Sequence, residues 1–241
     1  MNKKTFVLAL ACLVGRAALA QEALEEVVVT GSRSESSVPG TSLKRPGDFI
    51  LLTVQVSNDS RDEKTRKDEI TATLHAMLAA ASKDKSIELS VIGDNNLVLP
   101  LKLDSATLSL VNGKRQDTSE ATISVKTRIP TTVGNSTALV AKLRDFATGI
   151  KPVGRTVVDS DGDFEISIVN PAQYRDHVVE LFAADVRKVT AALGSDYKVV
   201  ARGIDKPIEW VRDGMLEVTI FVPYTYDVLP ATVSAYMHAT E

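Results

Sequence analysis

The fold is decided by residues 48–82, DFILLTVQVSNDSRDEKTRKDEITATLHAMLAAAS, which join an alternating strand to a long helix. Residues 48–57 alternate apolar and polar side chains, a pattern that predicts a strand. Ser60 and Glu63 have the spacing of a capping box, so a helix is expected from about residue 61 to residue 82. Its first turns are nearly all charged and are expected in water. An apolar stripe that would face a core follows at Ile70, Leu74, Met77, Leu78 and Ala81.

The rest of the chain alternates strands and helices in a similar way. Asn112-Gly113 and Ser160-Asp161-Gly162 are predicted to be hairpin turns. Asn170-Pro171 is expected to open the third helix as a cap and first-turn proline, and Gly194 to end it. Further strands are predicted at 87–92, 97–103, 106–111, 121–129, 154–158, 163–169, 197–202 and 215–222. Further helices are predicted at 136–147 and 171–193.

The order strand, long helix, strand, strand occurs at 48–129 and again at 163–222. This loose internal duplication predicts an α+β fold. It would consist of two βαββ-like units, with antiparallel sheets and long helices packed on one face. The chain would then divide into a leader (1–20), an N-terminal strand and tether (21–47), the α+β domain (48–228) and a tail (229–241).

In this order of elements the chain resembles the SIMPL-domain family of exported proteins over about residues 48–228. The resemblance rests on the strand and long helix that open the domain and on the late helix that ends at Ala192-Leu193-Gly194. Between them it rests on a strand pair, the short helix before Gly149, and a hairpin of the kind around Asp161-Gly162. The closing strand Val218–Tyr226 also fits. The family usually opens with a Gly-rich strand, which this chain replaces by another segment. The resemblance implies a periplasmic or surface-associated protein without a settled biochemical role, and some family members form large ring-like oligomers.

The first 20 residues have the pattern of a signal peptide. Lys3 and Lys4 precede an apolar run over residues 5–15, and Ala18-Leu19-Ala20 supplies a small-residue cleavage site. Cleavage after Ala20 would export the chain, with the periplasm as the expected destination. The apolar run is too short to span a bilayer, and no later segment offers about 18 apolar residues, so no membrane span is expected.

Composition narrows the function classes. Removing the leader from the 241-residue chain takes away three basic residues and the only cysteine, Cys12. What remains is 25 bases against 31 acids, a net charge of −6. An acidic chain argues against a nucleic-acid partner, and the lack of cysteine excludes disulfides and thiol chemistry.

A short motif follows the leader, and a Ser-, Pro- and Gly-rich stretch that ends at Pro46-Gly47 predicts a flexible tether behind it. Consecutive valines and a threonine favour an extended backbone, and an extended segment on a tether can add to the edge of another sheet. The candidate protein-interaction residues are therefore Glu25, Glu26, Val27, Val28, Val29 and Thr30.

The run EEVVVTGSR (residues 25–33) resembles the Ton box of TonB-dependent outer-membrane receptors. In that family the box adds as a strand to the periplasmic energy-coupling protein. This chain is too short for the plug and the barrel of about 22 strands that complete such a receptor. Two interpretations remain open. The segment serves a small soluble client of a TonB-type partner, or it is a strand that pairs within the protein's own fold or oligomer.

The search for chemistry gives no catalytic, cofactor-binding or metal-binding candidate. His75, His177 and His238 lack the spacing of a metal site. The run Asp159-Ser160-Asp161-Gly162-Asp163 resembles a calcium loop but has its glycine misplaced, so a turn explains it better. The leading hypothesis is a non-enzymatic binding or assembly protein of the cell envelope that forms homo-oligomers. The alternative is an exported hydrolase or small-ligand-binding protein whose site is built from scattered residues.

Overall fold

The computed structural model describes residues 24–29, 38–104, 110–113, 115, 117–131 and 136–232. The predicted leader, Thr30 and residues 233–241 lie outside the described residues. The α-helices are α1 (Glu63–Ala81), α2 (Ser136–Thr148) and α3 (Arg175–Leu193), with short 3-10 turns η1 (Asp94–Asn96) and η2 (Pro171–Tyr174). The strands are β1 (Glu26–Val29), β2 (Leu43–Pro46), β3 (Phe49–Asn58), β4 (Glu88–Ile92), β5 (Val98–Pro100), β6 (Val111–Asn112), β7 (Ser119–Arg128), β8 (Thr156–Asp159), β9 (Phe164–Val169), β10 (Tyr197–Arg202), β11 (Glu209–Arg212), β12 (Glu217–Phe221) and β13 (Thr225–Pro230).

The main body is an eight-stranded antiparallel sheet with the order β1-β9-β3-β7-β4-β5, in which β6 pairs with β7 and β8 with β3. The sheet curls until its two outer strands meet, because Val27 of β1 forms an isolated bridge with Leu97, just before β5. Alternate residues of β3 therefore point into two cores. Ile50, Leu52 and the other even-numbered apolar residues face the larger core. A smaller cluster inside the curl contains Val28, Phe49, Leu51 and Val98.

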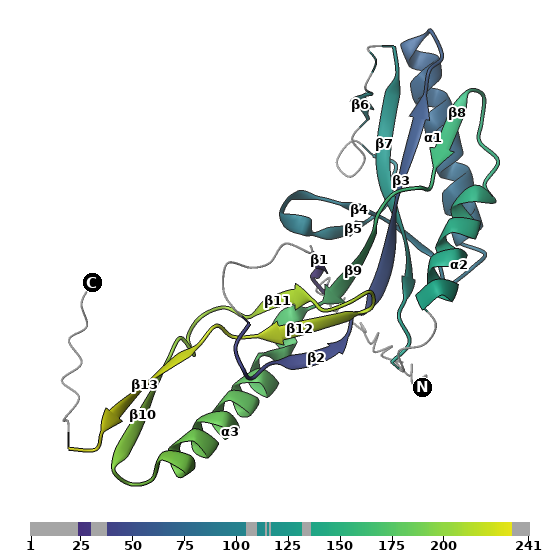
Figure 1. The fold of residues 1–241 in the computed structure, drawn as a ribbon. Coiled ribbons are helices and arrows are strands. Elements are labelled where there is room, and N and C mark those ends of the chain that lie inside the picture. The colour runs from purple at the N-terminus through teal and green to yellow at the C-terminus, as the bar shows by residue number, and fades with distance from the viewer. Residues whose placement is uncertain are drawn as a thin grey trace, which may run out of the picture.

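Helices α1 and α2 both pack against β3 and β7 (Figure 1). The predicted stripe of α1 is confirmed at Ile70, Leu74 and Met77, which are fully buried. The predicted capping box is wrong. Asp62 caps the helix by accepting a hydrogen bond from the Thr65 backbone N–H at 2.7 Å. Ser60 instead turns inward, because its hydroxyl donates to the carboxylate of Glu69 at 3.1 Å.

The predicted hairpin around Gly162 is also wrong. Strands β8 and β9 both pair antiparallel with β3, one after the other along its length, so the chain does not reverse there. Asp159 lies opposite Gln55 and Phe164 lies opposite Leu52, so β3 has two residues between these positions where the other side has four. The extra residues form a bulge. A Cβ atom at Gly162 would lie 2.2 Å from the backbone oxygen of Thr53, so the bulge requires glycine.

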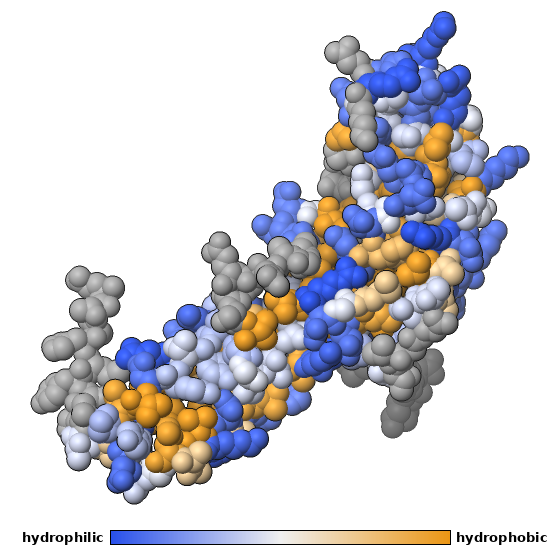
Figure 2. Space-filling view, viewed as in Figure 1, coloured by the Kyte–Doolittle hydropathy of each residue, from blue (hydrophilic) through white to orange (hydrophobic). Residues whose placement is uncertain are grey.

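The remaining strands and α3 form an arm that extends from the body (Figure 1). One three-stranded sheet has the order β11-β12-β2, and β10 pairs with β13 in a two-stranded sheet. Val178 and Phe182 are the buried residues of α3, so only the first half of its predicted stripe is core. At the tip, Leu193, Tyr197 and Val228 are between 36% and 46% exposed, where Figure 2 shows an apolar area.

The structure is α+β, with mixed helices and antiparallel sheets. Residues 43–46, expected at the end of a flexible tether, form β2 and pair with β12. The two predicted repeats are built differently. The first contributes β3, β4 and β7 to one sheet around α1, whereas the strands after α3 lie in the two small sheets. Helices α1 and α2 cover the large sheet, and α3 packs against β10, β12 and β2.

Candidate functional site

The candidate interaction strand β1 lies in the protein's own sheet. Its four residues pair antiparallel with β9, from Glu26 opposite Val169 to Val29 opposite Ile166. The three valines are between 1% and 6% exposed, whereas Glu25 is exposed. The predicted strand is therefore present. Of the two interpretations that the sequence left open, pairing within the protein's own fold is the one seen in this structure.

The backbone pattern of β1 follows from one bond at its start. The Asn170 N–H donates to the Glu25 carbonyl oxygen at 2.5 Å. Hydrogen-bonded and non-hydrogen-bonded pairs alternate along an antiparallel ladder. Val27–Ile168 is therefore a hydrogen-bonded pair, and Val28–Ser167 is a non-hydrogen-bonded pair with closely spaced side chains. The other edge of β1 faces β5, where it forms only the single bridge to Leu97.

A buried ion pair attaches β1 to the inside of the curl. The Lys126 ammonium lies 2.5 Å from one carboxylate oxygen of Glu26, and the Ser167 hydroxyl donates to the other oxygen at 2.6 Å. Both charged side chains are nearly buried, with exposures of 8% for Lys126 and 11% for Glu26. The ammonium also lies 4.2 Å above the centre of the Phe49 ring and 3.3 Å from the half-exposed carboxylate of Glu88. Three strands, β1, β7 and β9, thus meet at one carboxylate.

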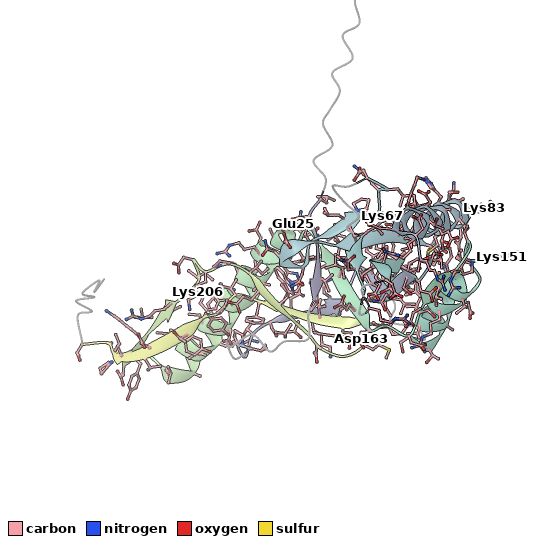
Figure 3. All side chains as sticks on the ribbon, turned by 90° about the horizontal axis from the view of Figure 1, so that it is seen from above. Glu25, Lys67, Lys83, Lys151, Asp163 and Lys206 are labelled. Carbon is pink, nitrogen blue, oxygen red and sulfur yellow. The ribbon has the colours of Figure 1, made fainter. Side chains whose placement is uncertain are left out.

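A cavity of about 370 Å³ opens beside this ion pair, between β1 and β5. Its walls are mostly apolar, and Glu25, Glu26 and Lys126 contribute its charged groups. The full lining consists of Leu24, Glu25, Glu26, Leu97, Val98, Leu99, Pro100 and Lys126. Figure 3 shows Glu25 part of the way along the molecule, between Lys206 of the arm and Lys67 and Lys83 of the body. Because β1 lines the cavity and closes the curl at Leu97, displacing it would open both.

The polar residues of this site attach β1 to its neighbouring strands. Ser167 is fully buried, so its hydroxyl cannot meet a substrate while β1 is in place. His75 and His177 are exposed on helices, and His238 lies outside the described residues. Among the described residues, no group of three or more His, Cys, Asp or Glu side chains could hold a metal ion. No described helix is long and apolar enough to cross a membrane.

Sequence reasoning found the strand but missed its partners. Lys126 and Ser167 lie 100 and 141 positions from Glu26, in strands that were predicted only as strands. One signal was available. Lys126 is a charged residue within the predicted strand at 121–129, and such a residue requires a partner if it is buried.

Comparison with models of known protein families gives no match, and a search of curated proteins gives none either. The fold and the site together define an α+β protein whose N-terminal strand is held in its own sheet by a buried carboxylate–ammonium pair.

Proposed function

We propose that the protein is a non-enzymatic binding or assembly protein of the cell envelope, of SIMPL type, and that β1 is its interaction element. It would reach the periplasm through its leader. The repeated order of strand, helix and two strands would be the family's duplication, although the two copies pair their strands differently. The strand would leave the protein's own sheet and add to a partner. That partner would be a TonB-type periplasmic protein or a second copy of this chain.

The observation that carries the proposal is that β1 is paired along one edge only, with β9, and meets its other neighbour at the single Val27–Leu97 bridge. Burying its three valines contributes about 5–9 kcal/mol. Ordering the six residues 24–29 costs about 9 kcal/mol, so the two terms nearly cancel. The backbone ladder to β9 and the Glu26–Lys126 pair then decide whether the strand is docked. A partner that offers its own sheet edge can compete with an attachment of this size.

The arm supports the assembly part of the proposal. Leu193 at the end of α3, Tyr197 at the start of β10 and Val228 of β13 are each at least a third exposed. Figure 2 shows an apolar area at this end of the arm. The arm is narrow at this point, because one helix packs there against a two-stranded sheet. A second copy of this chain packed on the tip would bury these side chains and give the homo-oligomer.

A disulfide that locks β1 in place tests the proposal. Val28 and Ser167 form a non-hydrogen-bonded pair, the kind whose Cβ atoms lie closest, so V28C/S167C brings two cysteines together. The only natural cysteine, Cys12, lies in the predicted leader. The variant is compared oxidised and reduced, with V28C and S167C alone as controls, by light scattering and by a pull-down with a periplasmic TonB domain.

We expect the reduced protein to assemble or to bind the TonB domain, and the oxidised protein to do neither. Recovery on adding a reductant shows that the lock, and not the substitutions, is responsible. Equal assembly or binding in both states refutes β1 as the interaction element. A monomer that ignores the TonB domain in both states refutes the proposal as a whole.

A second candidate function, binding of a small ligand, is favoured by the cavity of about 370 Å³ beside β1. Its apolar wall of Leu97, Val98 and Leu99 suits an apolar group, and Glu25 stands at its rim. The same locked variant separates the two functions. A ligand held between β1 and β5 binds equally well in the oxidised and reduced states, because it does not require the strand to leave.

A further inference from the structure

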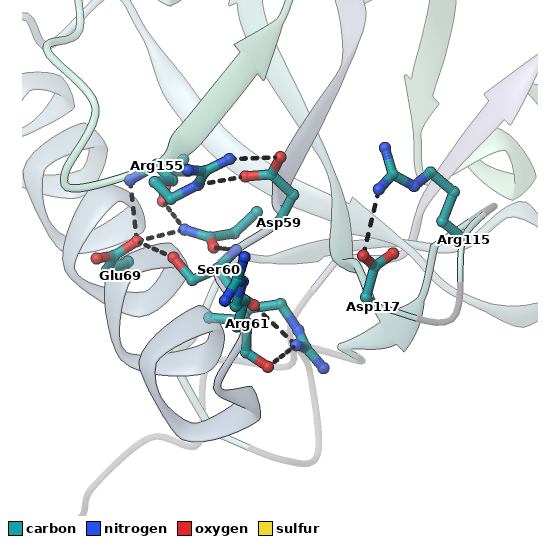
Figure 4. A network of polar contacts seen from close by, with 10 residues as sticks. Asp59, Ser60, Arg61, Glu69, Arg115, Asp117 and Arg155 are labelled. Atoms are coloured by element: carbon teal, nitrogen blue, oxygen red, sulfur yellow. Dashed lines mark hydrogen bonds and ion pairs between the residues drawn. The ribbon is translucent and has the colours of Figure 1, made fainter.

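A second cavity, of about 580 Å³, lies at the end of the body opposite the arm, where β3 ends and α1 begins (Figures 1 and 4). Strand β8 starts on one side of it, and the segment after the β6 strand lies on the other. We call it the arginine cavity. All six residues that line it carry polar side chains: Asp59, Ser60, Arg61, Arg115, Asp117 and Arg155.

The acidic residues around the arginine cavity already have partners. The Arg155 guanidinium donates two hydrogen bonds, of 2.7 and 2.9 Å, to the carboxylate of Asp59. This contact lowers the pKa of Asp59. Arg115 pairs with Asp117 at 3.2 Å. Figure 4 shows these two pairs on opposite sides of the view. The carboxylate of Glu69 lies behind the wall and accepts from the Arg155 backbone N–H, Asn58 and Ser60.

Two cations of this region lack an acidic partner. Arg66 is only 6% exposed, yet its guanidinium donates only to neutral oxygens: Ser119 Oγ at 3.0 Å and the carbonyls of Ser60 and Arg61 at 2.8 and 3.1 Å. Arg61 is exposed, and among the described residues no carboxylate forms an ion pair with it or with Arg66. Arg66 is thus held without an ion pair at contact distance, although its charge, after the hydrogen bonds from Thr65 and Lys67, helps to lower the pKa of Asp62 and of Glu63. Arg66 donates to the backbone carbonyls of Ser60 and Arg61, which both line the cavity, so its charge lies next to the cavity wall.

The start of α1 adds to the positive potential. The first backbone N–H groups of the helix and its dipole favour an anion there. Two acids sit at this terminus, but both are engaged. Asp62 accepts from Thr65, and Glu63 pairs with Lys67 at 2.6 Å. An incoming anion therefore meets guanidinium groups whose acidic neighbours are already paired.

We propose that the arginine cavity binds the phosphoryl group of a small, polar phosphorylated molecule. Arg61 and Arg155 would contact the phosphoryl oxygens, since planar guanidinium groups match phosphate oxygens in pairs. Arg66 would add its positive charge from beneath, where it also faces Asp62 and Glu63. The cavity is larger than a phosphate ion, and its polar wall suits a hydroxylated remainder such as a sugar. This site is separate from β1 and does not depend on the function proposed for that strand.

Calorimetric titration of the purified protein with glucose 6-phosphate tests this inference. Glucose and inorganic phosphate are titrated in parallel to separate the sugar from the phosphoryl group, and sulfate tests for a general anion effect. We expect glucose 6-phosphate to bind, inorganic phosphate to bind more weakly, and glucose not to bind. Affinity should fall as salt is added, because the attraction is electrostatic.

The variants Arg61→Gln and Arg155→Gln are compared with Arg187→Gln, which removes the same charge from an exposed position on α3. Arg61→Gln should weaken binding by at least about tenfold, or about 1.4 kcal/mol. Arg155→Gln should weaken it further, because it leaves Asp59 facing the ligand without its partner. Arg187→Gln should have no effect. The inference is overturned if millimolar glucose 6-phosphate does not bind, if sulfate binds equally well, or if the Arg61 and Arg187 variants behave alike. Unchanged melting temperatures without ligand show that Arg61→Gln and Arg187→Gln remain folded.

Discussion

Replacing Lys126 by methionine should release β1 from the sheet. Methionine keeps much of the lysine's length and its contact with Phe49, but it removes the only ammonium within reach of Glu26 among the described residues. The Glu26 carboxylate would then stay buried with the Ser167 hydroxyl as its sole polar partner. Because docking of β1 is otherwise nearly balanced, we expect the strand to undock before the rest of the sheet is affected.

The size of the effect follows from burial. Removing one partner of a buried ion pair costs about 3–5 kcal/mol, and both side chains here are about nine-tenths buried. The cation–π contact with Phe49, worth about 0.5–2 kcal/mol, is lost as well. A loss of 3 kcal/mol lowers the ratio of docked to free β1 more than about a hundredfold. This is comparable to what the ladder of four residues supplies at about 1 kcal/mol for each net hydrogen bond.

Amide hydrogen exchange is the assay, because it reports on each strand separately. In the Lys126→Met protein the Val27 amide should lose its protection, while amides in the centres of β3 and β7 keep theirs. The double variant Glu26→Gln/Lys126→Met removes both charges and keeps an acceptor for Ser167, so it should recover most of the protection. Unchanged protection of Val27 in the single variant would refute the reasoning, and so would a double variant that is no better than the single one.

Four further outcomes are expected. Phe182→Ala should cost about 3–5 kcal/mol in urea unfolding, because this buried ring packs edge-on against Tyr224 with the ring centres 4.4 Å apart; a loss below about 1 kcal/mol would contradict its place in the arm's core. Lys64→Ala should change stability by less than about 0.5 kcal/mol, since the Lys64–Asp68 pair is exposed, and a larger change would indicate a contact not seen here. Gly162→Ala should cost about 1–3 kcal/mol in thermal unfolding, because the added Cβ meets the Thr53 backbone, and an unchanged melting temperature would mean that the bulge adapts freely. Burial raises the pKa of Glu165, so folding favours its protonated form, and this contribution to stability is lost as the pH rises through the folded pKa; Glu165→Gln should flatten this part of the pH dependence, and an unchanged slope would show that another group causes it.

The longest periodic segments were the predictable part of the fold. The predicted bounds of α1, α2, β3 and β7 agree with the structure to within about two residues, because their patterns extend over several turns or pairs. Strand β2 was missed because LKRP contains one strongly apolar residue and resembles a loop. Its pairing with β12 joins positions more than 170 residues apart, which local pattern does not encode.

At two places the local sequence is compatible with more than one structure. Asp, Ser and Gly at 159–163 suit a reversing turn and a bulge equally well. The length of β3 decides between them, since it is long enough to carry β8 and β9 in line. In the same way, Ser60 and Asp62 are both good helix caps. The inward position of Glu69, which takes the Ser60 hydroxyl, leaves Asp62 as the cap.

The Glu26–Lys126 pair also restricts which partner can take β1. Any sheet that accepts the strand in the same way must bury Glu26, and a buried carboxylate needs a cation and a donor opposite it. A second copy of this chain supplies Lys126 and Ser167 in the same places, so exchange of β1 between copies keeps every polar contact. A TonB-type partner must instead offer its own basic residue opposite Glu26 or leave that residue in water at the end of the new ladder. Glu26→Gln separates the two cases. It should leave the equilibrium of exchange between copies nearly unchanged, because the pair is lost equally from the home and the exchanged position of the strand. It should strengthen the binding of a partner that keeps residue 26 in water, because only the strand docked in the protein's own sheet loses the pair. Exchange between copies that becomes stronger in the Glu26→Gln protein would show that the ion pair is not rebuilt in the assembled state.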